Sequence, residues 1–157
     1  MRDSYKFSAQ PVTILLVDDD PDCRQLIRDA IEQGKLDNPV FEVSSGEEAL
    51  AFLHRQGEFI DAPRPGLVYL DIEMPGMNGQ ETLRAIRQDP RFADIAVVMM
   101  TGVTDDEQKR QAMTAGANSY TNKPTDAMTF MQTVVQSTNY WLRIHQFPST
   151  TGQASVA

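Results

Sequence analysis

Five short apolar runs alternate with segments of helical periodicity, and this alternation constrains the fold more than any other feature of the sequence. Most runs lack the polar–apolar alternation of a half-exposed strand, which is typical of parallel strands covered on both faces. They occupy residues 12–17, 39–43, 67–70, 95–100 and 118–121. Helices are predicted over 21–34, 46–55, 80–89, 104–116 and 125–145. We therefore predict one doubly wound, five-stranded parallel α/β sheet with helices on both faces and an extended last helix.

Composition excludes several classes of protein. A chain of 157 residues fits a single domain, and a net charge of −8 with no basic cluster argues against a nucleic-acid-binding surface. No apolar run approaches the roughly 20 residues of a membrane span, and the first ten residues lack the apolar core of a signal peptide. The single Cys23 fits a reducing compartment. We expect a cytoplasmic protein that binds neither nucleic acid nor a membrane.

Polar side chains follow four of the five predicted strands at the point where each strand ends. They are Asp18 and Asp19 after the first strand, Asp71 after the third, Thr101 after the fourth and Lys123 after the fifth. Because the carboxyl ends of parallel strands meet at one edge of the sheet, we expect these side chains to form one cluster. A further acid, Asp20, is expected to cap the helix that begins at Pro21.

The chemistry of this cluster points to phosphoryl groups and a metal ion. Carboxylates a few ångströms apart repel by roughly 4 kcal/mol per pair at an effective dielectric near 20, so the cluster favours a bound cation. An all-oxygen site suits hydrated Mg²⁺ better than zinc. Lys123 supplies a positive charge and Thr101 a hydroxyl donor, and Asp71 is the best-placed nucleophile. The glycine-rich fingerprints of nucleotide-binding loops are absent from the sequence.

Taken together, these residues resemble the receiver domain of two-component response regulators. The similarity covers about residues 12–146, and its motifs stand in family order: Asp18-Asp19, Asp71 followed by Met74-Pro75 and Gly79, Thr101, and Lys123-Pro124. The resemblance implies a flavodoxin-like sheet with strand order 2-1-3-4-5.

The resemblance also implies roles for individual residues. Asp71 would accept a phosphoryl group from a histidine kinase, with Mg²⁺ held by Asp18, Asp19, Asp71 and the main-chain carbonyl of Glu73. Lys123 would pair with the phosphoryl oxygens, Thr101 and Tyr120 would switch conformation together, and the Lys123–Pro124 bond would be cis. Glu73 and Val103 would flank the attacking water and so influence the phosphoryl lifetime. Such a protein is a phosphoacceptor and not an enzyme, apart from slow self-dephosphorylation.

The last predicted helix is long for a domain of this kind. About 21 residues span roughly 32 Å, whereas a five-residue strand spans about 17 Å, so we expect the helix end to overhang the sheet. The overhang carries five apolar or aromatic residues: Tyr140, Trp141, Leu142, Ile144 and Phe147. We expect a homodimer interface there, the alternative being that these residues fold back onto the core. With the loop at 56–66, this extension resembles the small regulators paired with phytochrome kinases.

These features predict an N-terminal arm (1–11), a receiver domain (12–147) and a disordered tail (148–157). A stand-alone regulator that signals through protein contacts is the leading interpretation. One alternative is a small Mg²⁺-dependent phosphatase with an aspartyl intermediate, because Asp18 and Asp20 have the two-residue spacing of such enzymes. The other is a phosphorylation-independent interaction module. Mg²⁺ binding and turnover of a phosphate ester separate the three.

Overall fold

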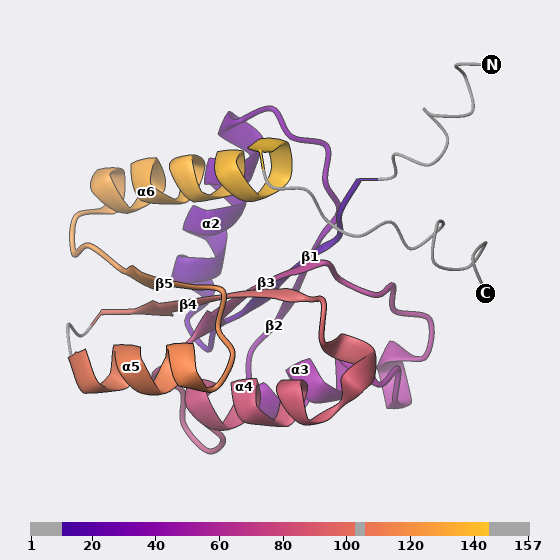
Figure 1. The fold of residues 1–157 in the computed structure, drawn as a ribbon. Helices are drawn as coiled ribbons and strands as arrows, with labels where there is room; N and C mark the ends of the chain where they lie inside the picture. Colours follow the sequence, from indigo (N-terminus) through magenta and orange to yellow (C-terminus); the bar gives the residue numbers. More distant parts are fainter. Residues whose placement is uncertain (1–10, 103–105, 145–157) are drawn as a thin grey trace.

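A five-stranded parallel sheet forms the centre of the molecule in the computed structural model, which describes residues 11–102 and 106–144 (Figure 1). The strands are β1 (Ile14–Val17), β2 (Val40–Val43), β3 (Leu67–Asp71), β4 (Ala96–Thr101) and β5 (Ser119–Asn122). Their order is β2-β1-β3-β4-β5, and every neighbouring pair is parallel. The predicted doubly wound α/β fold and its strand order are confirmed.

In the described part of the chain, five α-helices cover the two faces of this sheet. On one face lie α2 (Pro21–Gln33) and α6 (Ala127–Asn139); on the other lie α3 (Gly46–Leu53), α4 (Gly79–Gln88) and α5 (Asp106–Thr114) (Figure 1). Side-chain caps explain where several of them begin, because Asp20, Ser45, Asn78 and Asp126 each accept a hydrogen bond from a backbone N–H of the first turn. Asp20 is thus the helix cap that the sequence predicts. No helix in the described part of the chain is long and apolar enough to cross a membrane.

The core is split by the sheet into two layers. Successive residues of β1 point to opposite faces, so Leu15 and Val17 pack with α3 and α4 while Ile14 and Leu16 pack with α2 and α6. All four β1 residues are buried, as are all of β3 and β4. This double coverage accounts for the continuous apolar runs, because both sides of each central strand face a helix layer.

The end of the last helix differs from the prediction. After α6 the chain continues as a π-helical turn, Tyr140–Ile144, and Trp141 is only 7% exposed because it packs into the layer shared with α2. Arg143 donates a 2.8 Å hydrogen bond to the carbonyl of Gly34, which caps the carboxyl end of α2. The expected overhang is therefore wrong for Trp141. The last helix is longer than the strands, but α2, which has 13 residues, lies alongside it and provides a surface against which Trp141 packs.

Several predicted features lie outside the described residues. These are Val103, Phe147, the tail at 148–157 and the first ten residues of the N-terminal arm. Within the described turn, Tyr140 stays 44% exposed and its ring meets Trp141 edge-on at a centroid separation of 5.0 Å.

The long loop between α3 and β3 is held against the domain. Its short 3-10 helix, Gly57–Phe59, places the Phe59 ring 5.4 Å from that of Phe52, and Arg64 pairs with Asp94 and donates to the Arg91 carbonyl. Ile60 remains exposed at the loop surface.

Candidate functional site

Three carboxylates converge at the carboxyl edge of the sheet. Asp71 is the last residue of β3, and Asp18 and Asp19 directly follow β1. One oxygen from each lies within 4.8 Å of the others. Asp18 and Asp71 are only 3% and 5% exposed, whereas Asp19 is exposed. The predicted acidic cluster is therefore present, with two buried members and one open to solvent.

Lys123 lies between the two buried carboxylates. Its Nζ is 2.9 Å from Oδ2 of Asp18 and 3.1 Å from Oδ1 of Asp71. The lysine follows β5, and its backbone N–H donates to the Thr101 carbonyl. This ion-paired arrangement offsets part of the repulsion between the carboxylates.

The bond after Lys123 corrects one expectation. No peptide bond among the described residues is cis, so the Lys123–Pro124 bond is trans. The trans isomer is the intrinsically preferred form of an X–Pro bond, and Lys123 reaches both carboxylates with it.

Burial and charge set the pKa values of the cluster. Burial raises the pKa of Asp71 to about 6; the positive charge of Lys123 opposes that shift, and the negative charge of Asp18 adds to it. Burial alone would lower the pKa of Lys123, but the hydrogen bond and charge of Asp18, together with the charge of Asp71, leave it above its usual range. Burial, with a hydrogen bond to Asp18, also raises the pKa of Cys23 to about 12. Cys23 is thus a packed helix residue and not a reactive thiolate.

The backbone around Asp18 and Asp71 is fixed by further contacts. Arg24 donates to the main-chain carbonyl of Asp18 and pairs with Glu42 of β2. Asp18 Oδ1 accepts from the Asp20 N–H at 2.9 Å, and Asp71 Oδ1 accepts from the Glu73 N–H at 3.3 Å. These contacts orient the carboxylates before any ligand is bound.

The donor set fits a hard divalent cation. Carboxylate oxygens are the ligands that Mg²⁺ takes in proteins, and a cluster with one exposed member leaves room for water ligands. Asp18, Asp19 and Asp71 would hold the ion. The further ligand expected from the Glu73 main-chain carbonyl stays a prediction.

The affinity for Mg²⁺ should decrease as the pH is lowered. A protonated carboxyl group cannot ligate the ion, and the pKa of Asp71 is raised to about 6. At pH 5 we expect the Mg²⁺ affinity to be roughly tenfold below that at pH 8, because Asp71 is then ionised in only about one molecule in ten. Isothermal titration at the two pH values measures this. Equal affinities would show that Asp71 titrates near its ordinary value or is not a ligand.

Thr101 and Tyr120 lie on the neighbouring strands β4 and β5. Thr101 is fully buried at the end of β4, and Tyr120 is half-buried on β5, where it pairs in register with Met99. Because alternate residues share a face of a strand, Thr101 and Met99 project to the same side, where Tyr120 packs. The structure thus brings both predicted switch residues to one face of the sheet.

Two features of the site were not predicted from the sequence. Glu73 Oε1 accepts a hydrogen bond from the Gly102 N–H at 3.4 Å, so its side chain bridges the loops after β3 and β4. The side chain of Gln80 in α4 likewise donates a hydrogen bond to the main-chain carbonyl of Gln108 in α5. Neither contact has a sequence signal, because each depends on how two segments that are distant in the sequence approach each other.

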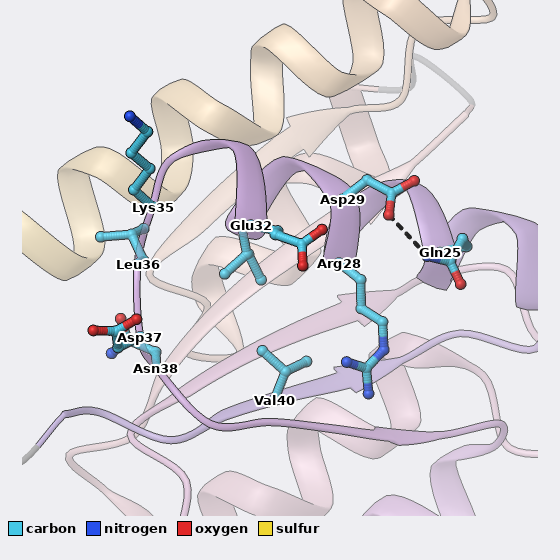
Figure 2. A pocket seen from close by; sticks show the side chains of 10 residues that line it. Gln25, Arg28, Asp29, Glu32, Lys35, Leu36, Asp37, Asn38 and Val40 are labelled. Carbon is cyan, nitrogen blue, oxygen red and sulfur yellow. Dashed lines mark hydrogen bonds between the residues drawn. The ribbon is translucent and has the colours of Figure 1, made fainter.

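One hollow lies away from the acidic cluster. Its lining comes from the second half of α2 and the segment leading into β2, with Arg28, Glu32 and Val40 around it (Figure 2). This end of α2 is at the opposite edge of the sheet from Asp71, because the helix begins beside the carboxylates and runs away from them.

Residues 14–135 match the response regulator receiver domain family, and the chain belongs to that family. Among its relatives is the response regulator Rcp1 of Synechocystis sp., 29% identical over 142 residues that cover 90% of this chain and 97% of Rcp1. The crystal structure of the Mn²⁺-bound form of Rcp1 superposes with a TM-score of 0.84 at 29% identity, covering 88% of this chain and 100% of that one. The crystal structure of the phosphorylated cyanobacterial phytochrome response regulator RcpA superposes with a TM-score of 0.85 at 29% identity, covering 89% of this chain and 100% of that one.

Proposed function

We propose that this receiver domain takes a phosphoryl group onto Asp71 from a histidine kinase in a Mg²⁺-dependent reaction. The observation that carries the proposal is the pairing of Lys123 with both Asp18 and Asp71, at 2.9 and 3.1 Å, inside a three-carboxylate cluster. A nucleophile, a positive charge and a cation-binding donor set are thus present at one edge of the sheet. The description of RcpA as phosphorylated, and of Rcp1 as Mn²⁺-bound, supports the same chemistry here.

In the proposed transfer, an Asp71 carboxylate oxygen attacks phosphorus. A new oxygen–phosphorus bond forms, and the bond from phosphorus to the donor's leaving atom breaks with its electron pair going to that atom. Lys123 stabilises the negative charge that spreads over the phosphoryl oxygens, and its two ion pairs hold it at the site beforehand. Bound Mg²⁺ would supply further charge neutralisation. Catalytic turnover is not part of this function, since the acceptor is a residue of the protein itself.

The response follows from the charge that the phosphoryl group adds. It brings roughly one to two negative charges and three acceptor oxygens to the edge that Thr101 shares with Asp71. We propose that Thr101 moves onto these oxygens and that Tyr120 moves with it, which alters the face formed by α5, β5 and α6. Such a change requires two arrangements that differ in their contacts with the phosphoryl group, so the unphosphorylated protein would sample the second one at low population.

The proposed partners are a sensor kinase and a second copy of the chain. RcpA is described as a phytochrome response regulator, and this supports a phytochrome-type kinase as the phosphodonor. We also propose a homodimer through the last helix, on which Met128 and Tyr140 are exposed. A mass in solution that stays monomeric at all concentrations, with and without phosphorylation, would contradict the dimer. The buried free Cys23 fits action in a reducing cytoplasm.

The direct test is intact-mass measurement after incubation with Mg²⁺ and acetyl phosphate. We expect one adduct of a single phosphoryl group, with none when the metal is chelated. The protein should release no phosphate from a small phosphate ester over many turnovers, which an aspartyl phosphatase would do. Absence of an adduct under all metal conditions would overturn the proposed function.

A further inference from the structure

A buried glutamine connects the segment after the Asp71 loop to the first turn of α5. Gln80 is the second residue of α4 and is only 7% exposed. Its side-chain Nε2 donates a 2.9 Å hydrogen bond to the main-chain carbonyl of Gln108, which belongs to the first turn of α5.

The α4 end of this connection rests on the backbone of Asp71 itself. The Gly79 N–H donates to the Ile72 carbonyl at 2.9 Å, and a Cβ at Gly79 would come within 2.4 Å of the Asp71 carbonyl oxygen. The start of α4 is therefore in direct contact with the phosphoacceptor's main chain. The next residue, Gln80, connects this end of α4 to α5 through its hydrogen bond.

Packing alone does not account for an amide at this position. The Oε1 atoms of both Gln80 and Gln108 are buried without a hydrogen-bond partner among the described residues. A buried acceptor left in this way opposes folding, whereas methionine would fill a similar volume without one. The favourable contribution of the Gln80 amide is its donated hydrogen bond to Gln108.

We propose that Gln80 is a positioning residue that holds the first turn of α5 in its unphosphorylated arrangement. The Gln80–Gln108 hydrogen bond favours this arrangement over the one that α5 adopts in the response. This preference rests on the proposed function. The hydrogen bond can change the equilibrium between the two arrangements of α5 by no more than its own net contribution, which is roughly fivefold for an ordinary value of about 1 kcal/mol.

Hydrogen exchange in the unphosphorylated protein tests the positioning role. Gln80→Met removes the donor at similar length, and Gln80→Glu replaces it with an oxygen that faces the Gln108 carbonyl. We expect amide exchange in α5 to speed up by roughly fivefold in Gln80→Met and by more in Gln80→Glu. The control is Gln88→Met, the same change at an exposed position near the other end of α4.

The thermal midpoint separates positioning from simple packing. Because Gln80→Met also removes an unpaired buried oxygen, we expect its midpoint to be no lower than that of the parent, while α5 alone exchanges faster. Unchanged α5 exchange in both Gln80 variants would overturn the proposal. So would faster exchange spread evenly over the whole protein, because that would indicate loss of stability.

The rate of adduct formation tests the link to the response. With Mg²⁺ and acetyl phosphate, we expect Gln80→Met to form the phosphoryl adduct up to roughly fivefold faster than the parent, with Gln88→Met unchanged. Faster α5 exchange with an unaltered adduct rate would overturn the preference for the unphosphorylated arrangement. If the parent forms no adduct, the proposed function fails, and the exchange measurement still decides whether Gln80 positions α5.

Discussion

Replacing Asp71 with asparagine should abolish the phosphoryl adduct that the parent forms with acetyl phosphate and Mg²⁺. Asparagine keeps the size and one oxygen of the side chain but lacks the anionic oxygen that attacks phosphorus. Intact mass under identical conditions measures the loss. Asp61→Asn, the same change at an exposed position in the loop before β3, should leave the adduct unaltered. An adduct persisting on Asp71→Asn would move the acceptor to Asp18 or Asp19.

The same variant should be more stable than the parent at high pH without metal. The pKa of Asp71 in the folded protein is raised to about 6, above the roughly 3.9 of an unfolded chain. The folded parent therefore gains stability from protonating Asp71 below about pH 4 and loses it as the pH rises through 6. At pH 8 we expect the free energy of unfolding of Asp71→Asn to be about 1–3 kcal/mol higher than that of the parent, and this difference should decrease toward pH 4.

Magnesium should reverse this order of stability. A ligand that binds only the folded state stabilises it by about 2.7 kcal/mol at a hundred times its dissociation constant. The parent, with all three carboxylates, gains this stabilisation, whereas the variant has lost one ligand of the cluster. Denaturant titrations with and without Mg²⁺ measure both effects. A variant that responds to Mg²⁺ as strongly as the parent would exclude Asp71 as a metal ligand.

The sheet could be predicted from the sequence because its central strands are buried on both sides. The β1, β3 and β4 segments must be apolar at every position, and this leaves a continuous signal that does not depend on the rest of the fold. The acidic cluster was predictable for a related reason. Parallel strands place their carboxyl ends at one edge, so Asp18 and Asp71 had to meet once the strands were located.

Contacts between helical segments could not be predicted in the same way. From the sequence alone, Trp141 is predicted to be an exposed interface residue, because the position of α2 beside it is not known. The hydrogen bond from Gln80 to the Gln108 carbonyl joins residues 28 positions apart, and nothing local in either segment requires it. In both cases the deciding quantity is a distance between elements, which hydrophobic periodicity does not encode.

Gly79→Ala should be the most destabilising single methyl addition near the site. An added Cβ would lie 2.4 Å from the Asp71 carbonyl oxygen and 2.6 Å from the Ile72 Cα, and both are backbone atoms that cannot rotate away. Overpacking of this kind costs about 1–3 kcal/mol or more, and relief requires α4 to move off the Asp71 backbone. We therefore expect the free energy of unfolding to fall by about 3 kcal/mol, together with weaker Mg²⁺ binding.

The control for this change is Gly34→Ala at the carboxyl end of α2. There the nearest neighbours of an added Cβ lie at 3.5 and 3.6 Å, and φ is −75°, which alanine adopts without strain. Restricting the unfolded chain should then raise the free energy of unfolding by up to about 1 kcal/mol. Denaturant titrations measure the change in the free energy of unfolding for both variants. A decrease for Gly79→Ala and an increase for Gly34→Ala would show that the close backbone contact at Gly79, and not the loss of a glycine as such, causes the destabilisation. If Gly79→Ala proved as stable as the parent, α4 would not rest on the Asp71 backbone in solution, and the route from Asp71 through Gln80 to α5 would lose its first contact.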